Sequence, residues 1–426
     1  MRKKAEASPK NKGGVRRFFA LLGPGLVTGA ADDDPSGIVT YSIAGAQLGT
    51  SMLWTALLTF PLMATVQMMC ARIGMVTGMG LAAALRKKMP KPMLMVMGLS
   101  LFMANTVNVS ADLSGMADVA KLLCGIPSGF FVVLFGVSII FATIRFKYNA
   151  IAAILKWLAL SLFAYVVTAF LVRPDWPKVL SDTFLPTWPT SHAQWSTLVA
   201  ILGTTISPYL FFWQSSQEVE VEKARGQRTS ASRRGGDPQE LRERAVDVGV
   251  GAFFSNLIMY FIILTAAFTL HKNGTTHLES SKEAAQALAP LAGHFAELLY
   301  AVGLIGVGLL AIPTLAGSAA YVFSETFGYR QGLDQKLHRA RAFYGILTLS
   351  IVLGVALTFT PIKPMNALFW SAVINGLLAP FVLVGILLVA WDGKLMLNQR
   401  SSLLARMTVV VVTAGMFAAG VAVFFL

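Results

Sequence analysis

Long apolar runs separated by short polar segments dominate the pattern of the chain. Eleven of these runs are long enough to cross a bilayer as a helix, which takes about 20 apolar residues. They cover residues 19–48, 52–77, 93–120, 128–145, 149–172, 195–222, 245–270, 294–326, 341–360, 365–391 and 403–426. The pattern predicts an all-α membrane protein with eleven transmembrane helices.

Two of the runs are interrupted near their middle. Residues 32–35 read Asp-Asp-Asp-Pro in the first run, and residues 204–208 read Thr-Thr-Ile-Ser-Pro in the sixth. Because proline removes a helix hydrogen bond and clashes with the preceding turn, we expect helices 1 and 6 to be broken there. The two breaks lie five spans apart, and an odd number of spans reverses the orientation of the second half. This spacing predicts a LeuT-like 5+5 inverted repeat with a peripheral eleventh helix.

The predicted organisation follows from these runs and from the positions of the basic residues. It consists of a basic N-terminal tail 1–18, a first five-helix repeat 19–172, an outer loop 173–194, a second repeat 195–391 with an inner loop 223–244, and the peripheral helix 392–426. A cytoplasmic N-terminus leaves only six of the 35 Lys and Arg residues in outer segments. Cytoplasmic loops are the ones rich in Lys and Arg. We therefore expect a bacterial inner-membrane protein with its C-terminus outside.

Composition excludes several classes of protein. The chain is 55% hydrophobic and 13% charged, with a mean hydropathy of +0.64, which places it in lipid. Its net charge of +14 is spread over loops, so a nucleic-acid surface is not expected. Cys70 and Cys124 show neither CxxC spacing nor a nearby histidine, and we interpret both as packing residues. No intramembrane nucleophile with a neighbouring base stands out, so we expect that the protein is not an enzyme. We also expect it to have no cofactor and to be a monomer.

Asp34 is the leading candidate functional residue. A carboxylate at mid-membrane costs about 2.5–3.5 kcal/mol on insertion scales, and no basic residue lies in the same span. Asp followed by Pro is also typical of a helix N-cap, and capping can coexist with ion binding. A carboxylate, hydroxyls and freed helix-end carbonyls suit a cation rather than an anion. The neighbouring acids Asp32 and Asp33 are expected to line a hydrated vestibule.

Residues 23–25, 34–37 and 45–49 resemble the first helix of Nramp-type divalent-metal transporters, and residues 316–322 with Glu325 resemble their eighth. The resemblance implies a metal site at Asp34, Gly37, Thr204 and Ser207. In the family an asparagine usually stands at the position of Gly37 and a methionine at that of Ser207, while Thr204 matches a coordinating backbone carbonyl. Two alternatives to a role in metal binding are that Gly37 only eases the turn and that Ser207 caps the second half-helix.

Further departures from the family concern the proton path. Gln214 stands where the family usually has a histidine, and Asp112 is kept while Gly115 replaces a glutamate. The arginine common in the ninth helix is also missing after Arg341. These differences resemble the branch called Nramp-related magnesium transporters, with Asp112 and Asp118 as remnants of a proton path.

Three more residues are expected near the site. Tyr209 and Gln214 follow the second break, and Asn375 lies in a stretch 374–376 that we interpret as an interruption of the tenth span. Asn375 would add an oxygen toward the site, although packing polarity is an equally good account.

The expected function is import of Mg²⁺ and Mn²⁺ by alternating access, without obligatory proton coupling. Losing a thioether removes discrimination against hard ions, and Mg²⁺ is usually held by one or two carboxylates with water retained. One alternative is a proton-coupled Mn²⁺/Fe²⁺ carrier with Asp112 and Asp118 as proton sites. A second is an amino-acid carrier of the same architecture, against which the acidic first break argues. A channel is the third, and saturable slow flux would exclude it.

Overall fold

The computed structural model describes residues 24–146, 160–227 and 229–425. The first half of the described chain contains α2 (Pro24–Asp32), α3 (Pro35–Leu48), α4 (Trp54–Thr77), α5 (Leu81–Leu85), α6 (Lys91–Cys124), α7 (Ser128–Arg145), η1 (Leu160–Leu162), α9 (Phe163–Leu171) and α10 (Trp176–Phe184). No strand occurs among these residues or in the rest of the described chain.

The second half is built in the same way. It contains α11 (His192–Thr205), α12 (Pro208–Ala224), α13 (Pro238–Thr269), η2 (His271–Asn273), α14 (Ser281–Ala285), η3 (Gln286–Leu288), α15 (Ala289–Ala292), η4 (Gly293–Phe295), α16 (Ala296–Phe327), η5 (Leu337–Arg339), α17 (Arg341–Leu357), α18 (Pro364–Ala390) and α19 (Leu403–Phe425).

Eight helical segments of the described residues are long and apolar enough to cross a membrane. The first predicted span forms the two shorter helices α2 and α3, and the ninth forms α17. The described part of the fifth span forms Leu160–Leu171. The described part of each predicted run is therefore largely helical. The tail 1–18, residues 19–23 of the first run, residues 149–159 of the fifth and residue 426 of the last lie outside the described residues.

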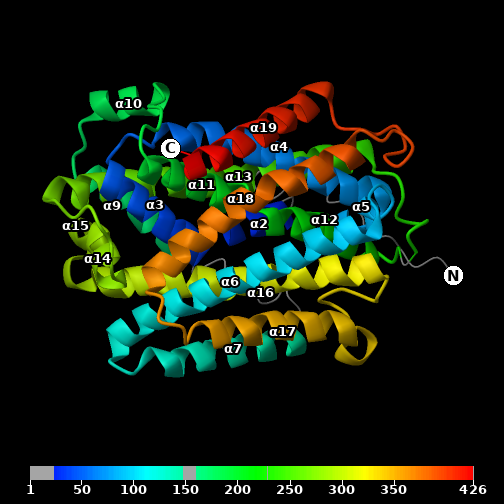
Figure 1. Ribbon diagram of the computed structural model, residues 1–426, viewed down its shortest axis with the longest axis horizontal. Helices are drawn as coiled ribbons and strands as arrows, with labels where there is room; N and C mark the ends of the chain where they lie inside the picture. The colour runs from blue at the N-terminus through cyan, green and yellow to red at the C-terminus, as the bar shows by residue number, and fades with distance from the viewer. Residues whose placement is uncertain (1–23, 147–159, 228, 426) are drawn as a thin grey trace, which may run out of the picture.

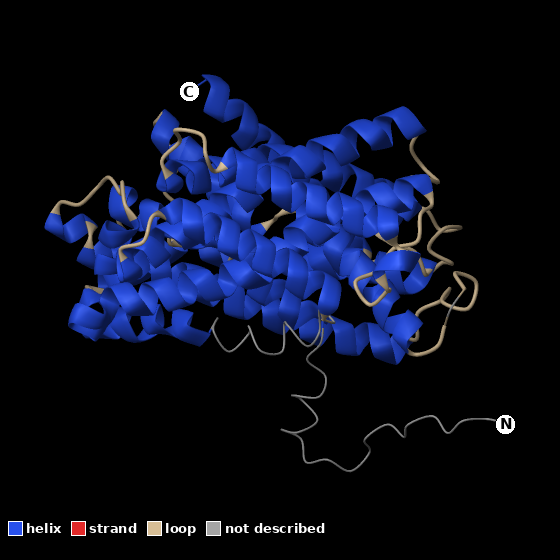
Figure 2. Ribbon diagram, turned by 90° about the horizontal axis from the view of Figure 1, so that it is seen from below, coloured by secondary structure: helices blue, strands red, loops and turns tan. Residues whose placement is uncertain are grey.

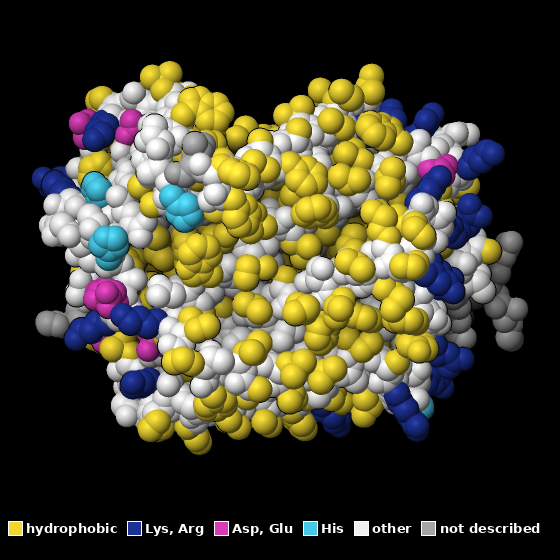
Figure 3. Space-filling view, viewed as in Figure 1, with side chains coloured by type: hydrophobic (Ala, Val, Ile, Leu, Met, Phe, Trp, Pro, Cys, Tyr) yellow, Lys and Arg dark blue, Asp and Glu magenta, His cyan; other side chains and the backbone are white. Residues whose placement is uncertain are grey.

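The long helices run side by side along the long axis, with α10, α14 and α15 at one end and α5 at the other (Figures 1 and 2). Hydrophobic side chains cover the middle of the face that Figure 3 shows, and the Lys and Arg side chains gather at its two ends. Large apolar side chains such as Val137, Phe141, Phe381 and Val411 are more than half exposed. An apolar exterior of this kind is what lipid requires.

Proline alone does not explain where helices break. Pro61, Pro313 and Pro380 lie inside the continuous helices α4, α16 and α18. At the two real breaks, Pro35 and Pro208 each stand at the start of a new helix, preceded by a residue with extended backbone. A proline is tolerated at the first helical position because its missing N–H is not needed there.

Two predictions about the remaining spans are wrong. The stretch 374–376 does not interrupt the tenth span, since α18 is continuous through it. Gly376 instead lets α18 approach α11, because a Cβ there would lie 2.3 Å from the carbonyl oxygen of Val199. Cys70 is buried as expected of a packing residue, whereas Cys124 is exposed at the end of α6.

The half-helix α2 packs against α13 with its backbone. A Cβ added at Gly25 would lie 2.6 Å from the nitrogen of Val248, and one at Gly29 would lie 2.5 Å from the backbone of Gly251. Only glycine fits so close an approach. The Gly25 N–H also donates to Asp247 Oδ2 over 2.8 Å. The half-helix α2 therefore contacts α13 both at the start of α2 and along its length.

Candidate functional site

Asp34 caps α3 at the first break and is buried, with 3% of its surface exposed. Its Oδ1 accepts hydrogen bonds from the Gly37 N–H at 2.8 Å and from the Ser36 hydroxyl at 2.7 Å. Its Oδ2 accepts from Asn108 Nδ2 of α6 at 3.2 Å. The capping prediction is confirmed. Among the described residues no Lys, Arg or His forms an ion pair with this carboxylate.

Asp32 and Asp33 turn toward α13. The Ser255 hydroxyl lies 2.9 Å from Asp32 Oδ2 and 3.0 Å from Asp33 Oδ1, so one hydroxyl serves two adjacent carboxylates. Both acids are buried, and Asp32 Oδ1 has no hydrogen-bond partner among the described residues. Three carboxylates therefore lie within three consecutive positions in the interior of the bundle, an arrangement that strongly favours positive charge nearby.

The second break has a different chemistry. Ser207 is buried, and its hydroxyl donates to the carbonyl oxygens of Gly203 at 2.8 Å and Thr204 at 2.6 Å. Ser207 is the N-cap residue of α12, as the capping alternative expects, but its side chain makes no cap hydrogen bond to that helix. The hydroxyl satisfies carbonyls that the broken helix α11 leaves free, as unwound backbone inside a membrane requires.

Two tyrosines join the breaks. The Thr204 hydroxyl donates to the Tyr41 hydroxyl of α3 over 3.0 Å, and Tyr209 of α12 donates to the carbonyl oxygen of Ala31 over 2.9 Å. Tyr41 and Tyr209 are both fully buried. The structure therefore brings the sequence-predicted residues Thr204 and Tyr209 against the first break, at one depth in the bundle.

Gly37 lies in the first turn of α3 beside Asp34. Its φ is not in the left-handed region, so the alternative that this glycine eases a turn finds no support in its backbone. A Cβ there would meet the Tyr41 ring at 3.4 Å and Asp34 Oδ1 at 3.5 Å, which are ordinary contacts. The missing side chain leaves room next to the carboxylate.

Gln214 of α12 belongs to a network of hydrogen bonds and ion pairs that lies beside the two breaks and does not include their residues. Its Oε1 accepts from the Thr28 hydroxyl of α2 at 2.7 Å, and its Nε2 donates to Glu218 Oε1 at 2.7 Å. Arg244 of α13 then pairs with Glu218 at 2.8 Å and with Asp247 at 2.5 Å. These contacts link α2, α12 and α13 through buried charges.

The other predicted residues lie in different surroundings. Asp112 is fully buried on α6, and neither of its carboxyl oxygens has a hydrogen-bond partner among the described residues. Asp118, further along α6, accepts instead from the Ser281 N–H of α14 at 3.4 Å. Asn375 is buried on α18, and its Oδ1 has no hydrogen-bond partner among the described residues.

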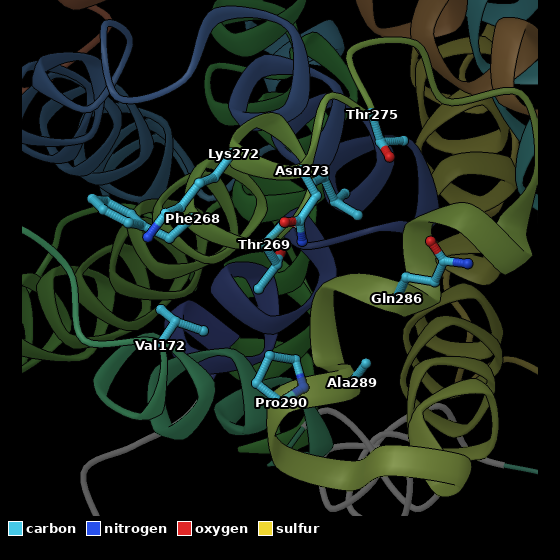
Figure 4. Close-up of a pocket in the computed structure, with 10 residues that line it drawn as sticks. Val172, Phe268, Thr269, Lys272, Asn273, Thr275, Gln286, Ala289 and Pro290 are labelled. Atoms are coloured by element: carbon cyan, nitrogen blue, oxygen red, sulfur yellow. The ribbon is translucent and has the colours of Figure 1, made fainter.

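A separate cavity of about 650 Å³ lies at the end of the molecule that carries α15 (Figure 4). Thr269 lines it from the end of α13, Lys272 and Asn273 from η2, and Gln286 and Pro290 from η3 and α15. None of the residues expected at the breaks lines this cavity.

Sequence reasoning missed four residues of the site: Ser36, Tyr41, Asn108 and Ser255. Ser36 could have been expected, since its hydroxyl follows the capping aspartate by two positions. Asn108 and Ser255 lie 74 and 222 residues from their partners, and only the tertiary fold brings them there.

Two half-helix pairs that meet at their broken ends inside a helical bundle define a membrane protein of the LeuT-like inverted-repeat fold. Solved structures agree. The manganese transporter of Eremococcus coleocola, in complex with an aromatic bis-isothiourea substituted compound, superposes with a TM-score of 0.76 at 20% identity, covering 98% of this chain and 89% of that one. MhsT in complex with L-phenylalanine gives 0.58 at 13% identity over 94% and 97%. The predicted fold class is confirmed.

The sequence places the chain within this fold more narrowly. Residues 25–426 match the Nramp family, described as natural resistance-associated macrophage protein-like, and the chain belongs to it. It is 25% identical over 406 residues to the divalent metal cation transporter MntH of Caldanaerobacter subterraneus subsp. tengcongensis, covering 94% of this chain and 91% of that protein. The MntH of Deinococcus radiodurans is 27% identical over 384 residues, or 88% and 82% of the two chains.

Proposed function

We propose that this chain imports divalent metal cations, Mg²⁺ and Mn²⁺, across a bacterial inner membrane by alternating access and without obligatory proton coupling. The observation that carries the proposal is the buried Asp34 carboxylate at the break between α2 and α3, where the described residues provide no cationic partner. Relatives named divalent metal cation transporters support it over nearly the whole chain.

The charge balance at the first break supports a cation as cargo. Asp32, Asp33 and Asp34 are buried together, and their hydrogen-bond donors are neutral hydroxyl, amide and backbone groups. Neutral donors reduce the repulsion between carboxylates only in part. A divalent cation supplies the missing charge and prefers oxygen ligands.

The second break supports a hard ion. Ser207 occupies the position where the family resemblance implies a thioether, and its hydroxyl donates to Gly203 and Thr204. Oxygen ligands with room for water suit Mg²⁺, whereas a thioether favours softer metals. Gly37 leaves room for about one methyl group beside Asp34 Oδ1, where an asparagine side chain would stand in the family.

Import is the direction that the membrane potential favours. With the N-terminus in the cytoplasm, only six of the 35 Lys and Arg residues lie in outer segments, as the positive-inside rule demands. A negative-inside membrane potential then favours entry of a divalent cation by about 2.3 kcal/mol per charge at 100 mV.

The test is flux into liposomes that contain the purified chain. We expect saturable uptake of Mg²⁺ and Mn²⁺ that follows the ion gradient and the imposed potential, while a pH dye inside reports no matched acidification. A constant ratio of protons to metal across several gradients would contradict uncoupled transport, and flux that never saturates would indicate a channel.

One observation favours the proton-coupled Mn²⁺/Fe²⁺ carrier as a second candidate. Asp112 is a buried carboxyl group one helical turn from Asn108, which contacts Asp34. It forms no ion pair among the described residues, and buried carboxyl groups of this kind serve as proton sites in other transporters. The same pH recording separates the two candidates, because a proton-coupled carrier must acidify the liposome interior in proportion to metal uptake.

A further inference from the structure

The face of α6 that meets the first break carries acceptor oxygens without donors. Asn108 is fully buried, and its Nδ2 donates to Asp34 Oδ2 over 3.2 Å. Because a carboxylate only accepts hydrogen bonds, the amide nitrogen must face Asp34. The amide oxygen Oδ1, bonded to the same carbon, therefore lies beside the same carboxylate. It is buried and has no hydrogen-bond partner among the described residues.

Asp112 follows Asn108 by four positions, so the two side chains lie on one face of α6. It is fully buried, and neither carboxyl oxygen has a hydrogen bond of normal geometry to any described residue. Asn108 contacts Asp34 from this face of α6. Because residues four apart on a helix are neighbours, Asp112 lies on the face of α6 that meets the first break.

Three unpartnered buried oxygens beside a buried carboxylate are costly. Each unsatisfied buried polar atom costs about 1–3 kcal/mol, and an ionised one costs more. Asn105 of α6 also has an unpartnered amide oxygen, but its nitrogen donates to Leu315 and Ser318 of α16 rather than to a carboxylate. What distinguishes Asn108 is that its amide contacts the buried Asp34 carboxylate.

A hard divalent cation removes this shortage, because it binds carboxylate and amide oxygens and carries the positive charge that the described residues do not supply. We propose that Asn108 Oδ1 and the Asp112 carboxylate are ligands of the transported cation and complete, from α6, the site that Asp34 begins. The inference rests on the proposed function of the first break. By the family resemblance, an asparagine would supply an amide oxygen to the metal from position 37, where this chain has glycine. In the proposed site Asn108 supplies that amide oxygen instead.

A ligand must be distinguished from a residue that only holds Asp34 in place. Exchanging an oxygen ligand for a thiol should weaken Mg²⁺ binding and strengthen Cd²⁺ binding, because thiolates prefer soft metals. Exchanging a positioning residue should weaken the binding of both ions together. The ratio of the two affinities, measured by calorimetry on purified protein, is therefore the informative quantity.

The experiment uses Asn108→Cys and Asp112→Cys in a chain whose exposed Cys124 is replaced by serine. Each variant is expected to raise the ratio of Cd²⁺ to Mg²⁺ affinity by about tenfold or more. The matched control is Asn105→Cys, which places a thiol on the same helix with its partners on α16 and should leave the ratio unchanged. A shift equally large in the control would overturn the assignment.

Further outcomes separate this inference from the proposed function. If the parent chain binds metal and Asp34→Ala abolishes that binding, but neither thiol variant changes the ratio, the α6 ligands are refuted and the proposed function stands. If the parent chain neither binds nor carries divalent cations, the proposed function itself fails. Where a thiol variant does not fold, Asp112→Asn and Asn108→Leu replace it, with Mg²⁺ affinity expected to fall about tenfold in each. Unchanged affinity in a folded variant would exclude that residue as a ligand.

Discussion

The two helix breaks lie at one depth and are joined by tyrosine hydroxyls, yet they differ in chemistry. The first break holds three buried carboxylates and draws donors from α3, α6 and α13. The second holds no charged side chain in residues 203–208, and its Ser207 hydroxyl bonds to carbonyls of the preceding helix. The two halves of the repeat thus supply unequal parts: the first contributes charge and the second contributes neutral dipoles.

This difference teaches that an unwound helix does not by itself make an ion site. Freed carbonyls can be satisfied locally, as Ser207 does at the second break. Excess charge cannot be satisfied locally, and at the first break it requires partners from distant helices. Changes at the first break should therefore alter ion binding, while changes at the second should alter selectivity or packing.

The largest effect is expected from Asp34. Asp34→Ala should abolish metal uptake while the protein remains folded and inserted, with affinity lower by about 100-fold or more. Asp34→Asn should also fail, because the amide keeps an oxygen but loses the charge that offsets desolvation of a divalent ion. Calorimetry and liposome flux on folded protein test both. Uptake near the parent rate would show that the first break does not carry the charge of the site.

A smaller effect is expected from Ser207. Ser207→Met should raise Cd²⁺ affinity by about tenfold and slow Mg²⁺ flux, because a thioether binds soft ions and displaces water that Mg²⁺ keeps. Adding Gly37→Asn should strengthen the shift if both side chains fit. The two quantities are measured on one preparation whose folding has been checked. If neither changes, Ser207 does not face the ion.

Ser255 sharpens the comparison through stability. Ser255→Ala removes the hydroxyl shared by Asp32 and Asp33 and should lower stability by about 1–3 kcal/mol, seen as a lower thermal midpoint in detergent. The matched control is Ser371→Ala in α18, a buried residue whose hydroxyl donates to the Leu368 carbonyl of its own helix. Equal losses in the two variants would mean that the shared hydroxyl is no more than an ordinary hydrogen bond.

The smallest effect is expected from Gly37. Gly37→Ala adds a Cβ with ordinary contacts and should change stability by less than about 0.5 kcal/mol. Gly203→Ala at the second break would place a Cβ 2.0 Å from the Ala372 carbonyl oxygen and should cost about 1–3 kcal/mol. Thermal midpoints of the two variants give the contrast directly. A loss for Gly37→Ala as large as for Gly203→Ala would contradict the room beside Asp34.

The sequence was sufficient for the parts of this picture that depend on local pattern. Apolar runs predicted the spans, and Asp34 before Pro35 predicted both a break and a cap. It misjudged 374–376, because Asn-Gly reads the same whether a helix ends or packs closely on a neighbour. Asn108 and Ser255 could not be chosen among the many polar residues of α6 and α13, since only the packing of helices decides which face meets the break.

The attachment of α2 to α13 has a consequence for the conformational equilibrium. A cytoplasmic exit that opens by tilting α2 must separate Gly25 from Asp247 and Thr28 from Gln214 at the same time. Each such bond is worth about 0.5–1.5 kcal/mol net, and more where a charge takes part. Since about 1.4 kcal/mol changes a population tenfold, losing both contacts biases the equilibrium against a tilted α2 by about tenfold. A ligand that shifts the protein toward the tilted state therefore has to bind that state more tightly by at least the same factor.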